Sequence, residues 1–273
     1  MSDPGEVSGG RHLASRLTAE SLQSRELLRA TDQQAVRALL PDLTVIKLGG
    51  SSILDRGPEA LLPVIDQLAE VADEHQLLIC AGEGARARHA YMIAADLGLP
   101  AGMLSILGNS VSEQNALIIS SLLMDRGAVN VPIALVPTLL SAGTPVVISG
   151  MPPFEWWEPP PAGPGRIPGN RTDAGAFLIA EAFGAQTVIY VKDQDGLHTQ
   201  DPASHPDTEL IANITASELR DRGLPDLPLE PVVLEMLVNA RVVQRVQLIN
   251  GLTAGNVVRA VRGDTVGTII AAG

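Results

Sequence analysis

The architecture of the chain is clearest in one stretch, Thr44-Val45-Ile46-Lys47-Leu48-Gly49-Gly50-Ser51. Five residues rich in β-branched side chains predict a buried strand, and the Gly-Gly pair after them predicts a tight turn. In a parallel sheet the carboxyl end of a strand faces the crevice where ligands bind. The glycines would let backbone N–H groups approach an anion, and Lys47 would supply positive charge. The alternative is an ordinary turn with a solvated lysine.

Strand and helix patterns alternate from this stretch to the C-terminus. We expect further strands at 77–81, 133–136, 145–148, 187–191, 246–249 and 268–271. We expect helices at 58–72, 86–97, 116–124, 174–183, 216–222 and 233–243, the third introduced by a capping box at 110–113. Short connections between alternating strands and helices favour right-handed crossovers. The pattern therefore predicts an α/β fold, with a mostly parallel central sheet sandwiched by helices.

Two segments interrupt this alternation. Residues 1–40 are polar and show no strand pattern, which fits either a disordered tail or an arm that docks on a neighbouring subunit. Met151–Asn170 is dense in proline and glycine, which is typical of a long loop between lobes. We therefore expect an N-terminal extension at 1–40 and a domain at 41–273, divided into lobes at 41–168 and 169–273.

Composition narrows the classes of function. The formal net charge of −12 argues against binding of nucleic acid or of an anionic membrane, since both require a basic surface. No apolar stretch approaches the roughly 20 residues that span a bilayer, and the N-terminus lacks a signal-peptide pattern, so we expect a cytoplasmic protein. The single cysteine, Cys80, lies inside an apolar run and is expected to be a buried structural thiol.

Three further loops carry polar residues that could bind a ligand. The turn Gly82-Glu83-Gly84-Ala85-Arg86 opens a helix, whose N-terminus with Arg86 nearby favours an oxyanion, although an inward-facing Glu83 would repel one. Asp173 begins another helix, either as a simple cap or as a catalytic carboxylate. Residues 192–202 carry carboxylates at two-residue spacing but lack the later glutamate of a calcium loop. Together the four loops predict a nucleotide–Mg²⁺ site at one edge of the sheet.

The order of these motifs resembles the amino-acid-kinase family, which includes the uridylate kinases. The matching patterns are Lys-x-Gly-Gly from Lys47, Gly-x-Gly-x-x-x-Arg from Gly82, Thr-Asp-Ala-Gly-Ala from Thr172, and Lys-Asp-x-Asp-Gly-Leu-x-Thr-x-Asp-Pro from Lys192. Asn250-Gly251 and residues 263–269 match the family's closing pattern, so the likeness spans residues 42–270. Within the family, the chain resembles the beta-type subunits of the molybdenum-storage branch at 85–89, 149–153, 171–175 and 246–252.

This resemblance implies an ATP-binding subunit of a hexameric cage. The cage would be a homo-oligomer or a hetero-hexamer with a related alpha-type chain. It would store molybdate or tungstate as polynuclear metal-oxide clusters, and hydrolysis of ATP with Mg²⁺ would load them. A histidine cluster of the alpha-type chain is replaced here by Phe154-Glu155-Trp156-Trp157-Glu158, so cluster contacts that depend on imidazole cannot come from this loop.

The resemblance also implies a set of site residues. Lys47 and Asp173 are the candidate catalytic groups, with Asp173 organising the phosphate-side network. The cofactor-binding candidates are Gly49, Gly50 and Ser51, then Gly82, Gly84 and Arg86, and finally Lys192, Asp193, Asp195, Gly196, Leu197, His198, Asp201 and Pro202. The last group, in the nucleotide-binding lobe 169–273, would form the adenine side and the approach to Mg²⁺. His198 either contacts the ligand or fills the loop, and no metal ligand is singled out.

Two other functions remain open at this stage. One is a small-molecule kinase of the uridylate-kinase type, which transfers the γ-phosphate of ATP to UMP or to a carboxylate. The other is a nucleotide-binding interaction subunit without turnover. Glu83 stands where the kinases have a small residue, which favours storage over transfer to a nucleotide. Lys47 and Asp173 disfavour an inert protein.

Overall fold

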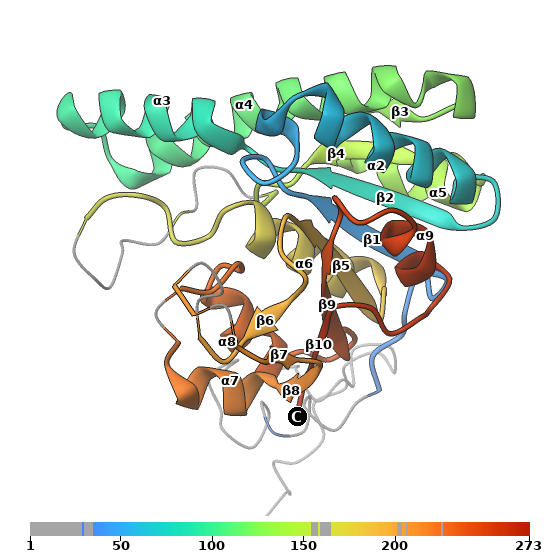
Figure 1. Cartoon of the computed structure of the whole chain (residues 1–273). Helices are drawn as coiled ribbons and strands as arrows, with labels where there is room; N and C mark the ends of the chain where they lie inside the picture. The colour runs from blue at the N-terminus through green and yellow to red at the C-terminus, as the bar shows by residue number, and fades with distance from the viewer. Residues whose placement is uncertain are drawn as a thin grey trace, which may run out of the picture. The chain divides into compact units, whose positions relative to one another are not determined.

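An eight-stranded sheet forms the centre of residues 38–273, in the order β3-β4-β2-β1-β5-β9-β10-β8 (Figure 1). The computed structural model describes residues 29, 35–153, 158, 165–200, 204–205, 207–224 and 226–273. The expected N-terminal extension lies almost wholly outside the described residues, as does most of 154–164 in the expected long loop. Contacts within the chain separate Met1–Arg37 from Ala38–Gly273, and the sheet belongs entirely to the second unit.

The sheet is parallel at every pairing except one. Its strands are β1 (Leu43–Leu48), β2 (Gln76–Ala81), β3 (Val129–Asn130), β4 (Val146–Ser149), β5 (Thr187–Lys192), β8 (Asn213–Thr215), β9 (Arg245–Asn250) and β10 (Thr268–Ala271). Only β9 and β10 run antiparallel, which confirms the mostly parallel sheet expected from the sequence. Because β1 pairs with both β2 and β5, one continuous sheet joins the two expected lobes, and their boundary at 168/169 stays a prediction.

Helices cover both faces of this sheet. One face carries α2 (Pro58–Val71), α4 (Ala101–Leu122) and α9 (Asn256–Val261), and the other carries α5 (Val136–Ser141), α6 (Thr172–Phe183), α7 (Ala216–Arg222) and α8 (Val232–Val238). Helix α3 (Gly84–Asp96) packs on α4 (Figure 1). A small antiparallel pair, β6 (Leu197–His198) and β7 (Leu210–Ile211), lies outside the main sheet. No helix in the described part of the chain is long and apolar enough to cross a membrane.

Alternation along the two central strands sets where the site lysines lie. In β1, Val45 packs into the core cluster with α6 and α8. Lys47 is two residues further along the strand, so it lies on that same face. In β5, Tyr190 packs into the same cluster, which places Lys192 on the α6 face as well. The period of two in both strands therefore brings two lysines to one side of the sheet.

The start of α4 was predicted wrongly. The capping-box pattern at 110–113 lies in the middle of one continuous helix, Ala101–Leu122. Ser110 donates to the Ile106 carbonyl inside that helix and caps nothing. Ser112 and Asn115 face inward, where they donate to the carbonyls of Ala81 and Gly82 at the end of β2. The Ser110 and Glu113 pattern thus imitated a helix start, although both side chains bond within α4, Ser110 to Ile106 and Glu113 to Asn109.

Two other elements differ from expectation. The expected strand at 133–136 is a 3₁₀ turn, Ile133–Leu135, that runs into α5, where Pro137 occupies a first-turn position that favours a helix. Helix α8 ends at Val238 and does not reach residue 243. The backbone N–H groups of residues 241–243 donate instead to the Glu181 carboxylate, so a tertiary contact ends the helix. The remaining 3₁₀ segments, Leu54–Arg56 and Met124–Arg126, are short connections.

Candidate active site

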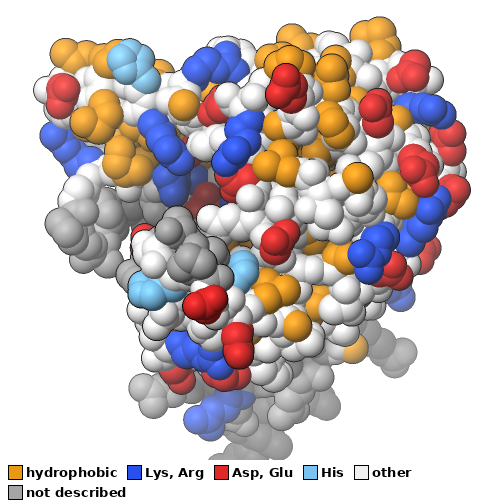
Figure 2. All heavy atoms as spheres, viewed as in Figure 1, with side chains coloured by type: hydrophobic (Ala, Val, Ile, Leu, Met, Phe, Trp, Pro, Cys, Tyr) orange, Lys and Arg blue, Asp and Glu red, His pale blue; other side chains and the backbone are white. Residues whose placement is uncertain are grey.

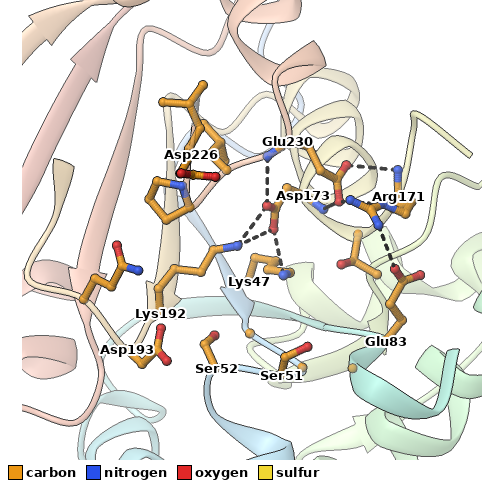
Figure 3. A pocket seen from close by; sticks show the side chains of 18 of the residues that line it. Lys47, Ser51, Ser52, Glu83, Arg171, Asp173, Lys192, Asp193, Asp226 and Glu230 are labelled. Atoms are coloured by element: carbon orange, nitrogen blue, oxygen red, sulfur yellow. Dashed lines mark hydrogen bonds and ion pairs between the residues drawn. The ribbon is translucent and has the colours of Figure 1, made fainter. Parts of the chain in front are cut away.

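The two lysines on the α6 face meet one carboxylate. The Lys47 Nζ lies 2.7 Å from Oδ1 of Asp173, and the Lys192 Nζ lies 2.9 Å from its Oδ2 (Figure 3). Asp173 enters from the first turn of α6, while the lysines come from the ends of β1 and β5. Tyr190 fixes the backbone there, because its hydroxyl donates to the Asp173 carbonyl over 2.9 Å. The arrangement joins three elements through one buried side chain.

A crevice of about 610 Å³ opens at this point. Figure 2 shows the hollow, with basic and acidic side chains on its walls. Its lining holds four basic and five acidic side chains, so the crevice as a whole is not basic. These are Lys47, Arg88, Arg171 and Lys192, against Glu83, Asp173, Asp193, Asp226 and Glu230. An anion would therefore be attracted by individual lysines and arginines and not by the net charge of the crevice, and a cation bound with it would strengthen its binding.

Burial and pairing shift the protonation of this charged centre. Burial would raise the pKa of Asp173, but Lys192 and Lys47 together hold it below its usual value. Burial lowers the pKa of Lys47, yet the Asp173 carboxylate outweighs this effect and raises it. For Lys192 burial prevails, and its pKa falls from 10.5 to about 8. Near neutral pH, Asp173 is thus ionised and both lysines are mainly charged.

A second buried carboxylate, Glu230, supports Asp173 from the loop before α8. Its Oε2 accepts from the N–H groups of Arg171 and Ala174, at 3.0 and 3.1 Å, and its Oε1 accepts from Asp173 N–H at 3.1 Å. In return, the Glu230 N–H donates to Asp173 Oδ2 over 3.3 Å. Burial and the Asp173 charge raise the pKa of Glu230 to about 7. A protein carboxylate thus already caps the N-terminus of α6.

The first two glycine turns touch each other through their backbones. A Cβ on Gly50 would overlap the backbone of Gly84, and one on Gly82 would overlap the backbone of Gly50. A Cβ on Gly49 would overlap the Ser52 hydroxyl and crowd the Val191 carbonyl. The close approach of these segments of one chain therefore requires glycine at these positions, whichever ligand the crevice binds.

The N-terminus of α3 is not open to an anion, although the sequence suggested one there. The Asp55 carboxylate accepts from Ala85 N–H over 2.5 Å and fills that end of the helix. Arg86 turns away and donates to Asn115 and Gln114 on α4, and it does not line the crevice. Arg88, two residues further along, lines it instead.

Glu83 faces inward, as the sequence analysis had left open. Its carboxylate accepts from the Tyr91 hydroxyl over 2.6 Å and lies 3.8 Å from Nη1 of Arg171. A Cβ on Gly108 would overlap that hydroxyl, so α4 fits closely around the pair. Burial raises the pKa of Glu83, and the Tyr91 hydrogen bond offsets only part of the rise. The Nε of Arg171, also in this wall, is buried without a hydrogen-bond partner.

The expected adenine-side residues divide into two groups. Lys192 and Asp193 line the crevice, and Asp193 pairs with Arg56 at 2.5 Å. Of the other expected cofactor-binding residues, Gly49, Gly50, Ser51 and Gly84 line the crevice, whereas Gly82 does not. The others outside the lining are Asp195, which accepts from Asn250, and Gly196, Leu197 and His198 at β6. Asp201 and Pro202 lie outside the described residues.

Sequence reasoning missed one wall of the crevice. Residues 224, 226–231 line it between α7 and α8, and they include Asp226 and Glu230. Their only sequence signal was Glu230-Pro231 directly before an apolar helical run. Ser52 and Arg88 were also missed as lining residues, although Ser52 directly follows the first motif and Arg88 lies inside the second.

Protein side chains alone do not form a metal cage here. Among the described residues, no three His, Cys, Asp or Glu side chains gather so that they could hold a metal ion. Mg²⁺ typically binds through one or two carboxylates together with substrate phosphates, so the crevice suits a cation that arrives with a nucleotide.

Comparison with known proteins agrees with this geometry. The model of the Amino acid kinase family matches residues 42–250. The chain is 46% identical over 259 residues to the molybdenum storage protein subunit beta of Azotobacter vinelandii, covering 94% of this chain and 96% of the relative. It is 28% identical to the uridylate kinase of Methanothermobacter thermautotrophicus, covering 83% of this chain and 98% of the relative.

Solved structures show the same fold. The uridylate kinase of Archaeoglobus fulgidus superposes with a TM-score of 0.65 at 24% identity, covering 83% of this chain and 99% of the other. The UMP kinase of Bacillus anthracis gives a TM-score of 0.64 at 18% identity, covering 85% and 97%. The family match, the near full-length relative and the shared sheet lead to one conclusion: the chain belongs to the amino acid kinase family.

Proposed function

We propose that this chain is an ATP-binding subunit of an assembly that stores molybdenum or tungsten as metal-oxide clusters, together with a related alpha-type chain. The observation that supports it best is the crevice itself, which keeps the two-lysine centre around Asp173 but turns the buried Glu83 carboxylate inward. The relative with 46% identity, a storage protein subunit, points the same way.

The crevice fits a nucleotide in size and chemistry. Its volume of about 610 Å³ lies within the range of small-molecule sites. Lys47 and Lys192 would each keep one ammonium face toward Asp173 and turn the rest toward phosphate oxygens. Asp173 would hold the two lysines in place, and Asp193 would lie on the approach to Mg²⁺. Hydrolysis of bound ATP by water, to ADP and phosphate, would supply the free energy that loading an oxoanion into an acidic protein requires.

Transfer of phosphate to a nucleotide is the alternative. The lysine centre and the fold shared with uridylate kinases favour it. Glu83 opposes it, because a phosphate-bearing acceptor beside Arg88 and Arg171 would meet a carboxylate that is 8% exposed and anchored by Tyr91. Bringing a second anion to that wall costs electrostatic free energy unless Glu83 is protonated.

A paired assay on one preparation decides between storage and transfer. The protein is incubated with Mg²⁺–ATP and molybdate or tungstate, desalted, and analysed for bound Mo or W per subunit, with a matched sample lacking ATP. ADP release is measured in parallel with and without UMP or a carboxylate acceptor. We expect ATP-dependent metal retention and no acceptor-dependent ADP release.

The opposite pair of results would overturn storage. Metal that never exceeds the ATP-free sample, together with acceptor-dependent ADP release of about 1 per second or faster, would identify a kinase. ATP binding without either result would identify an interaction subunit without turnover.

A further inference from the structure

Glu230 makes an unusual set of contacts for a buried side chain. Its carboxylate accepts three backbone N–H groups at the first turn of α6, and its own N–H donates to Asp173 Oδ2. Figure 3 shows Glu230 directly beside the Asp173 side chain, on the side away from Ser51 and Ser52. The side chain is 8% exposed, so these contacts are shielded from water. Glu230 and Asp173 thus fix each other's backbone in both directions.

A carboxylate that belongs to α6 itself makes a similar contact without touching the crevice. Glu181, near the other end of α6, accepts from the N–H groups of Arg241, Val242 and Val243 at 2.6–3.1 Å. It is absent from the crevice lining. Each glutamate therefore ties α6 to a loop through three backbone groups, but only Glu230 contacts Asp173. Comparing Glu230 with Glu181 therefore distinguishes a contribution to folding stability from a contribution to the site.

We propose that Glu230 is a positioning residue of the crevice, holding the turn that presents Asp173 to Lys47 and Lys192. The inference rests on the proposed function, since it concerns how tightly the crevice binds Mg²⁺–ATP. Asp173 sits on the first turn of a helix, where a small rotation moves its oxygens relative to both lysines. Three shielded hydrogen bonds to that turn oppose the rotation. Without them, Asp173 would no longer hold the ammonium groups in one arrangement.

The charged groups around Glu230 come from several elements. Asp173 and Arg171 face it from α6 and the residue before it, and Lys47 from β1. Lys192 and Tyr190 of β5 also interact with its charge. Tyr91 of α3, which does not line the crevice, does so as well. Because Glu230 already satisfies the helix N-terminus, the phosphate chain is left to the lysines and arginines of the crevice.

The test measures Mg²⁺–ATP affinity by calorimetry, well below the melting temperature, in wild type and variants. Glu230→Gln keeps the shape but loses one acceptor oxygen, and we expect its Kd to rise about tenfold. Glu230→Ala loses both oxygens and should weaken binding further, so the conservative variant shows partial rescue. Glu181→Gln should lower the melting temperature by a similar amount, yet leave the Kd within about twofold of wild type.

A double-mutant cycle with Asp173→Asn shows whether Glu230 acts through Asp173. In the Asp173→Asn background, Glu230→Gln should change the Kd by less than about twofold, because the lysines then have no carboxylate whose position Glu230 could control. Full additivity of the two substitutions would overturn the proposal. So would a Kd for Glu230→Gln that matches wild type, or an equal loss of affinity in Glu181→Gln.

Hydrogen exchange on the wild type gives a test that needs no variant. Mg²⁺–ATP should slow amide exchange at residues 171–174 more than at 241–243, where Glu181 makes the comparable contact. Equal changes at both segments would contradict a positioning role. A wild type that binds no Mg²⁺–ATP under any condition would overturn the proposed function and this inference with it. Normal binding with an unaffected Glu230→Gln would overturn this inference alone.

Discussion

At the scale of single residues, Asp173 is the side chain around which the lysines of the crevice are arranged. It holds two lysines from different strands, and Glu230 bonds to the turn on which it sits. A carboxylate shared by two ammonium groups keeps them from repelling each other in a buried site. It also leaves them partly free, since each ammonium has three donors and spends only some on Asp173.

Replacing Lys47 with alanine should remove most of the affinity for Mg²⁺–ATP. Lys47 is 4% exposed and lines the crevice, so no side chain on the outer surface can supply the same positive charge there. We expect the Kd to rise at least about tenfold, and the thermal shift caused by Mg²⁺–ATP to be mostly lost. Arg126→Ala is the control, because Arg126 pairs only on the surface with Asp73 and Asp125. An unchanged thermal shift in Lys47→Ala would place the nucleotide elsewhere.

The pKa of Glu230 predicts how stability depends on pH. Burial and Asp173 raise this pKa from 4.5 to about 7. Between these values the folded protein binds more protons than the unfolded chain, so this group lowers the free energy of unfolding as pH rises. Glu230→Gln removes that effect. The melting temperature of the variant, relative to wild type, should therefore increase from pH 5 to pH 7.

The pKa of Lys192 predicts the opposite slope in a separate window. Burial lowers this pKa from 10.5 to about 8, so the unfolded chain binds more protons between these values. The group therefore raises the free energy of unfolding as pH increases from 8 to 10.5. Melting curves of Lys192→Met should lack this rise in stability. Parallel curves for variant and wild type in either window would contradict the corresponding pKa shift.

Single residues were predictable where a motif fixed them. Lys47, Asp173 and Lys192 all lie in short patterns that follow or begin regular elements, and the structure brings these three together. Glu230 could not be found in this way, because its role depends on a loop that folds back onto a helix 57 residues earlier in the sequence. Arg86 was misjudged because a helix N-terminus in sequence does not show that another chain segment, here Asp55, already caps it.

Among the secondary-structure elements, the two glycine turns after β1 and β2 behave as one unit. Their backbones are in direct contact, and the glycines leave no room for a Cβ. The sequence showed that turns follow these strands, but it could not show that the turns touch. Nor could it show where α4 begins. The polar residues Ser112 and Asn115 lie inside this helix and donate to backbone carbonyls at the end of β2.

Adding a methyl group to the first of these turns should be costly. Gly50→Ala would push the Gly84 backbone away, and we expect the free energy of unfolding to fall by about 3 kcal/mol. Gly169→Ala is the matched control, because no atom lies within 4 Å of its added Cβ, and it should change stability by less than about 0.5 kcal/mol. Denaturant unfolding measures both. Equal stabilities would show that the turns can separate freely.

At the scale of the whole molecule, the α3–α4 layer leaves apolar side chains uncovered in this chain. Met92, Ile93 and Leu97 are 59%, 50% and 73% exposed at the end of α3, and Leu117 and Ile118 of α4 are 59% and 46% exposed. Ile93 and Leu97 lie four residues apart and are therefore neighbours on the helix surface, and adjacent exposed apolar side chains are typical of an interface. The relative from Azotobacter vinelandii is named as a subunit, which agrees with association.

We therefore expect the protein to form an oligomer through this layer, alone or with a related chain. Light scattering at micromolar concentration should find a species larger than the monomer of 28.6 kDa. Met92→Glu should shift it toward monomer by placing a charge on the apolar surface. Leu252→Glu, at a residue that is 42% exposed and outside α3 and α4, should not. A wild type that stays monomeric with and without Mg²⁺–ATP would rule out a cage.

The whole fold was the most predictable level, because it depends on many residues at once. Alternating strands and helices with short connections leave few topologies, and the parallel sheet follows from them. The antiparallel pairing of β10 beside β9 and the small strands β3, β6, β7 and β8 escaped prediction. They are two to four residues long and carry no period of their own.

The contact between the glycine turns has a consequence for how such a protein can change over generations. A side chain on Gly50 or Gly82 would collide with the facing turn, and one on Gly84 with the Asp55 carboxylate, so substitution at these positions must displace a neighbouring group. New ligand preferences are instead expected at lining side chains outside these contacts, such as Arg88 and residues 226–229. The crevice thus has a fixed floor and adjustable walls. A library confined to the walls could be selected for other phosphate-bearing ligands on an unchanged scaffold.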